Sequence, residues 1–320
     1  SYCFSVSSIV LTAVNLRISC AKIQRTLKPE STDTAMSSSI YQLQNGSRTL
    51  SFSTPRIMGV LNCTPDSFFE GSRAASAKAA VETGQHMLAA GADVLDVGGQ
   101  SSRPGAVEVG AEEEWQRIER AIKGLLDAVP EALISVDTFH HEVALKALEA
   151  GAFMVNDIFG GSRDANMAQV IAQFNAPYAI MHMQGTPATM QERPAYEDIT
   201  TEVLHWLQDR MHSLAQQGVQ QQVVDVGFGF GKTPAHNFQL LRELDQFQAL
   251  NAPLLVGVSR KSMIYKTLNG RPETALNGTT ALHAWALERG AHMLRVHDVA
   301  EAREVVAVSY THLTLPTNTV

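Results

Sequence analysis

The sequence has few cysteines, no long apolar run and no excess of basic residues, and each shortage excludes a class of protein. Its 320 residues include three cysteines, Cys3, Cys20 and Cys63, whose spacing fits neither a metal site nor a disulfide framework. No run is long and apolar enough to span a membrane. The formal net charge of −7 argues against binding to nucleic acid, although local cations can still hold an anionic substrate inside an acidic protein. These shortages indicate a protein of the reducing cytoplasm without a nucleic-acid or membrane partner.

The N-terminal region differs in composition from the rest of the chain. Residues 1–28 contain four basic residues, many serines and no acidic residue. This composition fits either an organellar transit peptide or sequence upstream of a start at Met36, and we favour the second interpretation because the chain does not begin with Met. We therefore expect residues 1–35 to be an N-terminal extension that is disordered or non-native.

Hydrophobic periodicity predicts the fold of the remainder, which is long enough for one large domain or two ordinary ones. Segments 40–44 and 47–52 roughly alternate on either side of Asn45-Gly46, which predicts a type I′ β-hairpin within residues 36–53. Apolar runs then predict strands at 57–61, 94–97, 133–136, 153–156, 178–181, 223–226, 254–258 and 293–296. Helical patterns lie between and after them, at 74–90, 111–128, 140–150, 164–175, 197–217, 236–249, 274–289 and 299–308.

Eight strand–helix repeats in about 250 residues are typical of a (β/α)8 TIM barrel. The Val, Ile and Leu of the strands suit parallel strands that are buried on both faces, and Gly91, Gly151, Gly218 and Gly290 stand where helices end. A doubly wound open sheet is the alternative, but it gives no reason to stop at eight repeats. We predict a single α/β barrel at 54–308, preceded by the hairpin. Residues 309–320 lack a helical period and include Pro316, so we interpret them as a non-native or disordered tail.

In such a barrel the functional side chains lie at the carboxyl ends of the strands and in the loops that follow. The polar residues at those places are Asn62, Asp96, Asp137, Asn156, Asp157, His182, Asp225, Ser259, Lys261, Arg295 and His297. Buried carboxylates and amides such as Asp137, Asn156 and Asp225 can hold the N–H groups of a flat heterocycle. Cations and amides can hold phosphate, and this set consists of Asn62, Arg103, Lys261, Arg295 and His297.

Several of these residues have a plainer interpretation. Asp96 either takes part in the site or braces a loop, and both remain open. His182 is better interpreted as a packed histidine than as a base. Cys63 has no evident base beside it, which disfavours a nucleophilic cysteine. The histidines on helical patterns are expected at the solvated surface: His86, His140, His141, His205 and His212.

The glycine-rich segment Gly227-Phe228-Gly229-Phe230-Gly231-Lys232 is not a P-loop. A P-loop has four residues between its first Gly and the Gly-Lys pair, and here only three separate Gly227 from Gly231. The alternating phenylalanines suit a stacking wall better than a phosphate cradle. No claim of nucleotide hydrolysis follows from this segment.

Eight motifs resemble those of the dihydropteroate synthase family, in the same order. They are Gly59 to Phe68, Asp96-Val97-Gly98-Gly99 with Ser102-Arg103-Pro104-Gly105, Ile134 to Thr138, Val155 to Ile158, Met181 to Gly185, Gly227 to Lys232, Ser259 to Ser262, and Arg295 to Asp298. The resemblance covers roughly residues 40–308. It implies a transferase of folate biosynthesis, of a kind that sulfonamides target, which condenses 6-hydroxymethyl-7,8-dihydropterin diphosphate with 4-aminobenzoate to give 7,8-dihydropteroate and diphosphate, with Mg2+ as cofactor.

The resemblance also implies a role for individual residues. The pterin site would comprise Asp137, Asn156, Asp225, Phe230, Lys261 and Arg295. The diphosphate site would comprise Asn62, Ser102, Arg103, Arg295 and His297, with Asn62 also at the metal. The aminobenzoate site would comprise Phe68, Pro104, Phe230 and Ser259. The catalytic residues implied are Asn62, Asp137, Lys261, Arg295 and His297, and the family makes a homodimer the expected assembly, packed through helices near the C-terminal end.

Four positions depart from the family pattern. Val226 replaces a usual Pro, Gln100 and Ser102 stand where Glu and Thr are common, and Glu70 stands where Asp is frequent. Val226 is expected only to loosen a turn, and Ser102 keeps a hydroxyl. Gln100 and Glu70 bear on loop closure and inhibitor response rather than on the reaction class. Two rival functions remain: the pterin-binding barrel of a folate-dependent methyltransferase, and a degenerate paralogue that binds pterin without turnover. The Ser259–Ser262 and Asn62–Phe68 motifs favour the synthase over the methyltransferase. The presence of both loop motifs and of every expected phosphate contact argues against the paralogue.

Overall fold

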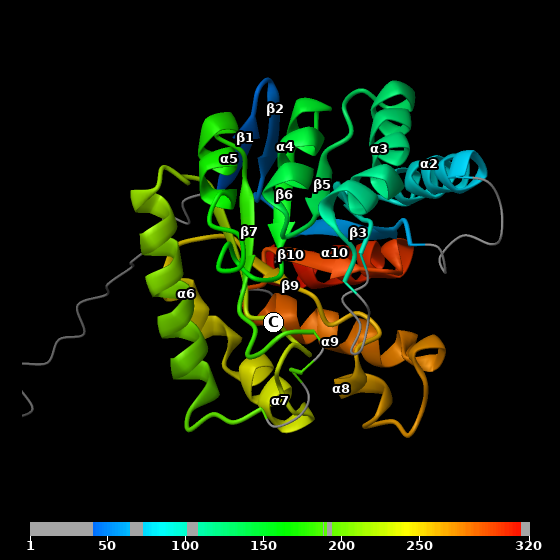
Figure 1. Ribbon diagram of the computed structural model, residues 1–320. Helices are drawn as coiled ribbons and strands as arrows, with labels where there is room; N and C mark the ends of the chain where they lie inside the picture. The colour runs from blue at the N-terminus through cyan, green and yellow to red at the C-terminus, as the bar shows by residue number, and fades with distance from the viewer. Residues whose placement is uncertain (1–40, 65–72, 101–107, 188, 191–193, 315–320) are drawn as a thin grey trace, which may run out of the picture. The chain divides into compact units, whose positions relative to one another are not determined.

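The computed structural model describes residues 41–64, 73–100, 108–187, 189–190 and 194–314. Its centre is a closed barrel of parallel strands in the order β10-β3-β4-β5-β6-β7-β8-β9 (Figure 1). The strands are β3 Arg56–Asn62, β4 Val94–Gly98, β5 Ile134–Asp137, β6 Met154–Asp157, β7 Tyr178–Met181, β8 Gln222–Asp225, β9 Leu254–Val256 and β10 Met293–Val296. The predicted (β/α)8 barrel is therefore confirmed, and the open-sheet alternative is excluded because β10 pairs with both β9 and β3.

Helices follow the strands and cover the outside of the barrel. They are α2 Arg73–Ala89, α3 Ala111–Ala128, α4 His141–Glu149, α5 Met167–Phe174, α6 Ile199–Gln216, α7 Pro234–Arg242, α8 Ser262–Tyr265, α9 Leu276–Glu288 and α10 Val299–Thr314, with short 3-10 helices η1 Leu244–Leu250 and η2 Pro272–Thr274. The glycines expected after four helices, Gly91, Gly151, Gly218 and Gly290, all have positive φ, as helix-terminating glycines do. Within the described chain no helix is long and apolar enough to cross a membrane.

The last helix is longer than the sequence pattern indicates. We expected it to end at Val308, but α10 continues to Thr314, and Ser309 is buried. Ser, Tyr and Thr are indifferent helix formers that an established helix can still incorporate, whereas Pro316 cannot continue one. The expectation of a structureless segment from residue 309 is therefore wrong for 309–314, while 315–320 lie outside the described residues.

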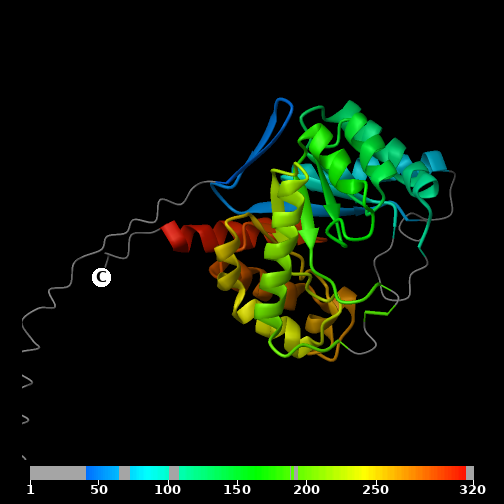
Figure 2. The same ribbon diagram turned by 60° about the vertical axis from the view of Figure 1, so that its left-hand side comes forward.

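The N-terminal hairpin consists of β1 Gln42–Asn45 and β2 Arg48–Ser51 and lies at the amino-terminal end of the barrel (Figure 2). Arg48 donates to the carbonyls of Ala132 and Gly151, and Asn45 Nδ2 donates to the carbonyl of Phe153 at 2.9 Å. Because Asn45 is held in the strand and pairs with Arg48, the two-residue turn is Gly46-Ser47, with Gly46 at φ 60°. The hairpin is confirmed, but its predicted type I′ turn at Asn45-Gly46 is wrong, since only the first turn residue has positive φ.

The interior of the barrel is apolar at the hairpin end and polar at the other. Hairpin residues Leu43, Leu50 and Phe52 form one buried cluster with a ring of strand residues, which includes Met58, Val94, Met154, Ala179, Val223, Leu255 and Met293. Residues two positions further along a strand point to the same side. The next inward positions therefore hold Val60, Asp96, Asn156, Met181, Asp225, Gly257 and Arg295, most of which are polar. The sequence thus places charged and amide side chains inside the barrel, in a layer next to the apolar cluster, and we call this layer the polar layer.

Candidate active site

The polar layer of the barrel is organised around the guanidinium group of Arg295 on β10. Arg295 Nε donates to Asp96 Oδ2 on β4 at 2.6 Å, and Nη2 donates to Asp137 Oδ2 on β5 at 2.7 Å. Asn156 Nδ2 on β6 donates to the same oxygen of Asp96 at 3.0 Å. Asp96 is fully buried. Of its two open interpretations, a place in the candidate site is favoured over the bracing of a loop, because this carboxylate accepts from the side chains of Arg295 and Asn156.

Asp225 and Lys261 lie beside this ion cluster. A Cβ atom built on Gly257 would lie 3.7 Å from Lys261 Nζ, 3.8 Å from Arg295 Cβ and 3.9 Å from Asp225 Oδ2. The absence of a side chain at Gly257 therefore leaves the space in which these three residues meet. Lys261 Nζ also donates to the carbonyl of Phe228 and lies 4.7 Å from the centre of the Phe230 ring.

Burial shifts the pKa values of these groups toward neutrality. Loss of water raises the pKa of Asp137 to about 7, with Arg295 opposing and Asp96 adding to the shift. Burial lowers the pKa of Lys261 to about 8, against the opposing attraction of Asp225. Burial also raises the pKa of Asp225, opposed by Lys261 and by the hydrogen bond from the Gly227 N–H. Perturbed groups that converge in one place are typical of a functional site.

The turn after β8 is fixed by a buried lysine that sequence reasoning did not single out. Lys232 Nζ lies 3.0 Å from His182 Nδ1 and from the carbonyl oxygens of Gly227 and Phe230, and it is only 2% exposed. Burial, with the nearby Lys232 charge adding, lowers the pKa of His182 to about 3, so His182 is a neutral packed residue as expected. The signal for Lys232 was its position directly after five residues of alternating Gly and Phe.

The loops after β9 and β10 meet at Ser259 and His297. Ser259 Oγ lies 3.0 Å from His297 Nδ1 and also accepts from the His297 N–H at 3.2 Å. His297 follows Arg295 by two residues, a spacing that places two side chains on the same side of a strand. The contact with Ser259 places His297 beside the loop after β9. Asn62 ends β3 and pairs in register with Gly98, so its amide lies at the same end of the barrel.

An apolar wall borders the polar layer. Phe139, Ile158, Phe159 and Met181 form a separate buried cluster, with Met183 and Phe230 packed against it. The guanidinium group of Arg163 lies over two rings of this cluster. Its carbon atom is 5.0 Å from the centre of the Phe139 ring and 5.1 Å from the centre of the Phe159 ring. A flat aromatic ligand would find one polar edge and one apolar face here.

Several predicted residues have no described position. Phe68, Ser102, Arg103 and Pro104 lie outside the described residues, as does the departure at Glu70. Val226 is fully buried, and Gln100 accepts from the Val109 N–H at 2.8 Å. The structure therefore brings together Asn62, Asp137, Asn156, Asp225, Phe230, Ser259, Lys261, Arg295 and His297.

The remaining sequence-based interpretations concern Cys63 and the histidines on helical patterns, and only some of them are confirmed. Cys63 is buried, and burial raises the pKa of its thiol to about 12, which excludes an activated nucleophile. Asp157 accepts from Tyr178 and from two backbone N–H groups, so it braces a loop. His86, His205 and His212 are exposed as expected. His140 and His141 are not, because His140 lies against the carbonyl of Val109 and His141 against Asp164.

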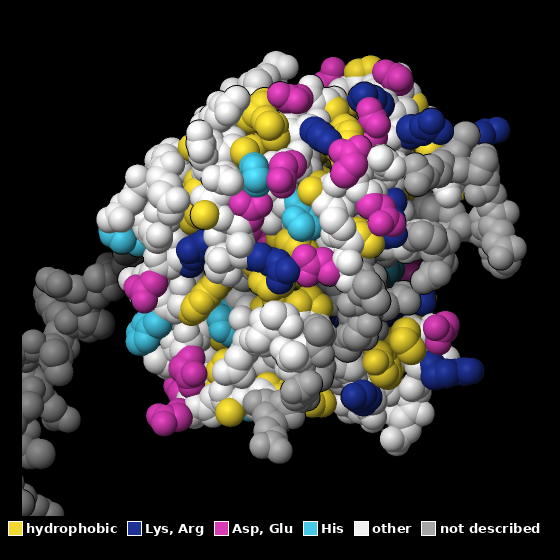
Figure 3. All heavy atoms as spheres, viewed as in Figure 1, with side chains coloured by type: hydrophobic (Ala, Val, Ile, Leu, Met, Phe, Trp, Pro, Cys, Tyr) yellow, Lys and Arg dark blue, Asp and Glu magenta, His cyan; other side chains and the backbone are white. Residues whose placement is uncertain are grey.

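One cluster of possible metal ligands was found among the described residues, and it lies outside the polar layer. It comprises His141, Glu142 and Asp164, with His141 Nδ1 2.8 Å from Asp164 Oδ2. These residues surround the first turn of α4, where the helix dipole is positive and disfavours a cation. On the face seen in Figure 3, acidic and basic side chains are interspersed.

Comparison with known proteins agrees with this geometry. A model of the family described as "Pterin binding enzyme" matches residues 58–297. The dihydropteroate synthase of Escherichia coli K12 is 43% identical over 261 residues, which cover 81% of this chain and 92% of that protein.

Solved structures of two further synthases are also similar. The enzyme of Xanthomonas albilineans was solved with 4-aminobenzoic acid (TM-score 0.81, 38% identity, 87% of this chain and 100% of that one) and with 7,8-dihydropteroate (TM-score 0.78, 35% identity, 86% and 100%). The Yersinia pestis enzyme was solved as a sulfonamide drug complex (TM-score 0.81, 37% identity, 86% and 100%). With its barrel, its polar layer and these similarities, the chain belongs to the dihydropteroate synthase family, whose members are transferases of the pterin-binding group.

Proposed function

We propose that the polar layer at the barrel mouth condenses 6-hydroxymethyl-7,8-dihydropterin diphosphate with 4-aminobenzoate, releasing diphosphate and 7,8-dihydropteroate. The observation that carries the proposal is the meeting of Arg295, Lys261 and Asp225 around Gly257, next to the buried carboxylate of Asp96 and the partly exposed carboxylate of Asp137. One end of the barrel thus offers fixed acceptors for a heterocycle and cations for a leaving anion.

The pterin edge would be held by Asp225 and Asn156, with Asp137 nearby. A pterin presents an exocyclic amino group and a ring N–H side by side, which a carboxylate can accept as a pair. Asp225 Oδ1 already accepts from the Gly227 N–H at 2.7 Å, so that contact fixes the direction of the carboxylate. Phe230 and the apolar wall of Phe139, Phe159 and Met181 would cover the flat face of the ring.

The diphosphate would be met by Asn62, Lys261, Arg295 and His297, with Ser102 and Arg103 from outside the described residues. The contacts with Asp96 and Asp137 use Nε and Nη2 of Arg295, so a phosphate oxygen would be met at Nη1. Charge that develops on the leaving oxygens is stabilised best by donors that are already in place. Asp96 and Asp137 orient the guanidinium group of Arg295 before the substrate binds.

The donor set at the end of β3 fits Mg2+. This ion takes oxygen ligands and usually keeps waters and substrate phosphates rather than a cage of protein groups. Asn62 offers one amide oxygen at the same end of the barrel as the proposed diphosphate cations. When bound, Mg2+ would supply additional stabilisation of the negative charge on the departing diphosphate. We propose Mg2+ as the cofactor on this basis.

The chemical step proposed is departure of diphosphate followed by attack of the neutral arylamine. The C–O bond to the diphosphate breaks with its electron pair on the diphosphate, and the electron-rich pterin stabilises the methylene cation. The lone pair of the neutral amine nitrogen then bonds to that carbon, and the resulting anilinium ion gives its proton to water. Because this ion is acidic, no strong base is required. Ser259 and Phe230, with Phe68 and Pro104, would place the amine.

A substrate with two deuterium atoms on the reacting methylene tests this order of events. Departure before attack changes the carbon from tetrahedral to planar in the transition state. We expect a clearly normal secondary isotope effect on kcat/KM. An effect close to unity would indicate that the amine attacks while the diphosphate is still bonded, and would contradict the proposed step.

The two rival functions differ from the synthase in a measurable way. A methyltransferase barrel would bind a methylated folate and release no diphosphate. A degenerate paralogue would bind the dihydropterin diphosphate without forming product. Similarity to synthases over at least 79% of the chain favours catalysis by this chain as well.

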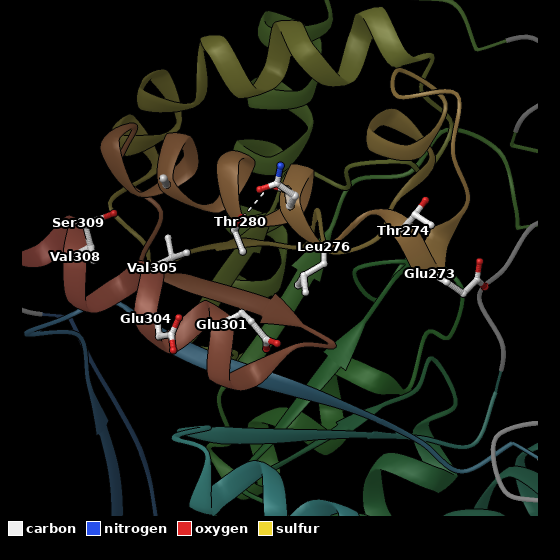
Figure 4. Close-up of a pocket in the computed structure, with 11 residues that line it drawn as sticks. Glu273, Thr274, Leu276, Thr280, Glu301, Glu304, Val305, Val308 and Ser309 are labelled. Atoms are coloured by element: carbon white, nitrogen blue, oxygen red, sulfur yellow. Dashed lines mark hydrogen bonds between the residues drawn. The ribbon is translucent and has the colours of Figure 1, made fainter.

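We also propose a homodimer that packs through α9 and α10. A groove of about 690 Å3 lies between these helices and η2, away from the polar layer (Figure 4). Its lining combines Leu276, Thr280, Val305 and Val308 with the acidic residues Glu273, Glu301 and Glu304. Val308 is 73% exposed, and Trp285 and Tyr310 nearby on the same helices are also exposed. Apolar side chains gathered on one face are typical of a protein interface.

The buried free thiol of Cys63 suits a reducing compartment, and we propose the cytoplasm.

A further inference from the structure

Arg260 and Asp298 belong to the motifs that carry Lys261 and His297, yet neither has a role in the proposed chemistry. Among the described residues, four that are not glycine have positive φ: Asn175, Asn251, Asn269 and Arg260. Asn tolerates the left-handed conformation well, whereas a long side chain such as Arg adopts it rarely. Arg260 has φ 55°, so contacts around it must hold the backbone there.

The side chain of Arg260 is fixed by a two-pronged ion pair. Arg260 Nε donates to Asp298 Oδ2 at 2.9 Å, and Nη2 donates to Asp298 Oδ1 at 2.6 Å. The two side chains are 30% and 15% exposed, so water screens the pair only in part. Parallel N–H···O bonds of this kind fix orientation as well as distance.

The backbone of Arg260 is fixed as well. Its N–H donates to Thr279 Oγ1 at 3.1 Å, and Thr279 is buried on α9. The two residues next to Arg260 in the chain, Ser259 and Lys261, both contact other residues of the proposed site. Ser259 contacts His297, and Lys261 passes Gly229, on which a Cβ would lie 3.2 Å from Lys261 Cδ.

These contacts join the loop after β9 to the loop after β10 at two successive residues. Ser259 pairs with His297, and Arg260 pairs with Asp298. A change of backbone conformation at residue 260 would move Lys261 and Ser259 together, because both are bonded directly to it.

We infer that Arg260 and Asp298 are positioning residues, whose ion pair holds residue 260 in the left-handed conformation that directs Lys261 toward Asp225 and His297 toward the substrate. They act through Lys261 and His297 and need not touch substrate. The inference rests on the roles proposed above for those two residues.

Three variants of the full-length protein test the inference. Arg260→Lys keeps the charge and removes the fork, Asp298→Asn removes the partner charge, and Arg260→Ala removes the side chain. Arg289→Ala is the control, because the Arg289–Asp245 ion pair (3.3 Å) lies at the other end of α9. For each variant kcat, KM for both substrates and the unfolding temperature are measured, together with kcat of Arg260→Ala in millimolar guanidinium chloride.

We expect kcat to fall about tenfold to a hundredfold in all three variants, because misplacement of a catalytic group by about 1 Å has effects of that size. The unfolding temperature should change no more than in Arg289→Ala. Added guanidinium should restore part of the kcat of Arg260→Ala, since it can bind Asp298, and should not rescue the double variant Arg260→Ala/Asp298→Asn.

Wild-type kcat in folded Arg260→Lys and Asp298→Asn would overturn the inference. So would a loss of kcat that guanidinium does not relieve and that parallels a fall in unfolding temperature, because the pair would then be only structural. The variant Lys261→Ala distinguishes a failure of the proposed function from a failure of this inference. Full activity in that variant would contradict the proposed function itself, whereas an inactive Lys261→Ala beside normal Arg260 variants would contradict only this inference.

Discussion

At the scale of single residues, the site depends on charges that are buried together. Arg295 satisfies Asp96 and Asp137, and the sequence could indicate each of the three as a polar residue at a strand end but not their pairing. Which strands face each other across the barrel depends on its closure. The same limit applies to Lys232, whose acceptors come from the β7 end and the β8 turn.

Glu114 is a buried acid outside the proposed site that should make stability depend on pH. It is fully buried, and its Oε2 accepts from Thr138 Oγ1 at 3.1 Å. Burial, with repulsion from Asp137 and Glu108, raises its pKa to about 8, against the opposing effects of Thr138 and Arg117. His140 Nε2 lies 3.9 Å away. The folded protein therefore holds this proton more tightly than the unfolded chain does.

Because the pKa is raised on folding, the stabilisation from this proton is complete below the usual pKa of Glu and is lost as pH rises toward about 8. We expect Glu114→Gln to have nearly wild-type stability at pH 5 and to be more stable at pH 9. The upper bound is about 5 kcal/mol, since each unit of pKa corresponds to about 1.4 kcal/mol.

Denaturant unfolding of both proteins across this pH range provides the measurement. A difference in stability that is constant from pH 5 to pH 9 would show that Glu114 does not titrate in this range. Thr138→Val, which removes the hydroxyl donor but no acid, serves as the companion variant.

At the scale of elements, the strands follow from their apolar runs, and most boundaries are within a residue or two of those predicted. The failures have local causes. The four-residue helix α8 is too short to show a period, and the predicted helix 236–249 divides into α7 and η1 around Glu243. The predicted start of α5 at residue 164 is too early because Asp164 binds His141 and the Asn166 N–H instead of entering the helix.

The turn after β8 is the element on which the proposed pterin site depends most. A Cβ on Gly227 would lie 1.9 Å from the carbonyl oxygen of His182, and Gly227 has φ 73°. Gly227→Ala would therefore force the turn away from β7 and displace Asp225 and Phe230. We expect at least a hundredfold loss of kcat/KM, of the order that about 1 Å of misplacement causes, and a destabilisation of more than about 2 kcal/mol.

Gly46→Ala is the matched control for this variant. Gly46 has a similar φ of 60°, but nothing lies within 4 Å of its Cβ position. This substitution should cost about 1–2 kcal/mol from backbone strain alone and leave kcat/KM unchanged. Equal effects of the two substitutions on kcat/KM would refute a special role for the Gly227 turn.

At the scale of the whole molecule, the hairpin, the proposed active site and the proposed dimer interface occupy three different parts of the fold. The hairpin closes the amino-terminal end, the polar layer occupies the other end, and the apolar face of α9 and α10 lies on the outside (Figures 1 and 4). The sequence alone predicted the barrel and the chemistry of its mouth. It could not indicate the exposed groove, because the hydrophobic residues of α10 look like an ordinary buried face until the neighbouring helices are placed.

The proposed dimer predicts the effect of one charge on α10. Val308→Lys should weaken self-association at least about tenfold, since a charged side chain in a buried interface loses its hydration at a cost of more than about 1.4 kcal/mol, and Glu304 one turn away offsets only part of it. The fold of each protomer should be unaffected because Val308 is 73% exposed. Gln173→Lys, an exposed position on α5, is the control for added charge.

Sedimentation equilibrium of the three proteins gives the association constants. If the wild-type protein is a monomer at micromolar concentration, or if Val308→Lys associates as tightly as Gln173→Lys, then α9 and α10 do not form the interface.

The most direct test of the account is product formation by the purified protein, given dihydropterin diphosphate and Mg2+, with and without 4-aminobenzoate. We predict release of diphosphate together with 7,8-dihydropteroate when 4-aminobenzoate is present. Both should be lost in folded Lys261→Ala and Asp225→Ala. Pterin binding without product in the wild-type protein, or wild-type turnover in those two variants, would contradict the claim that the polar layer at the barrel mouth is the active site.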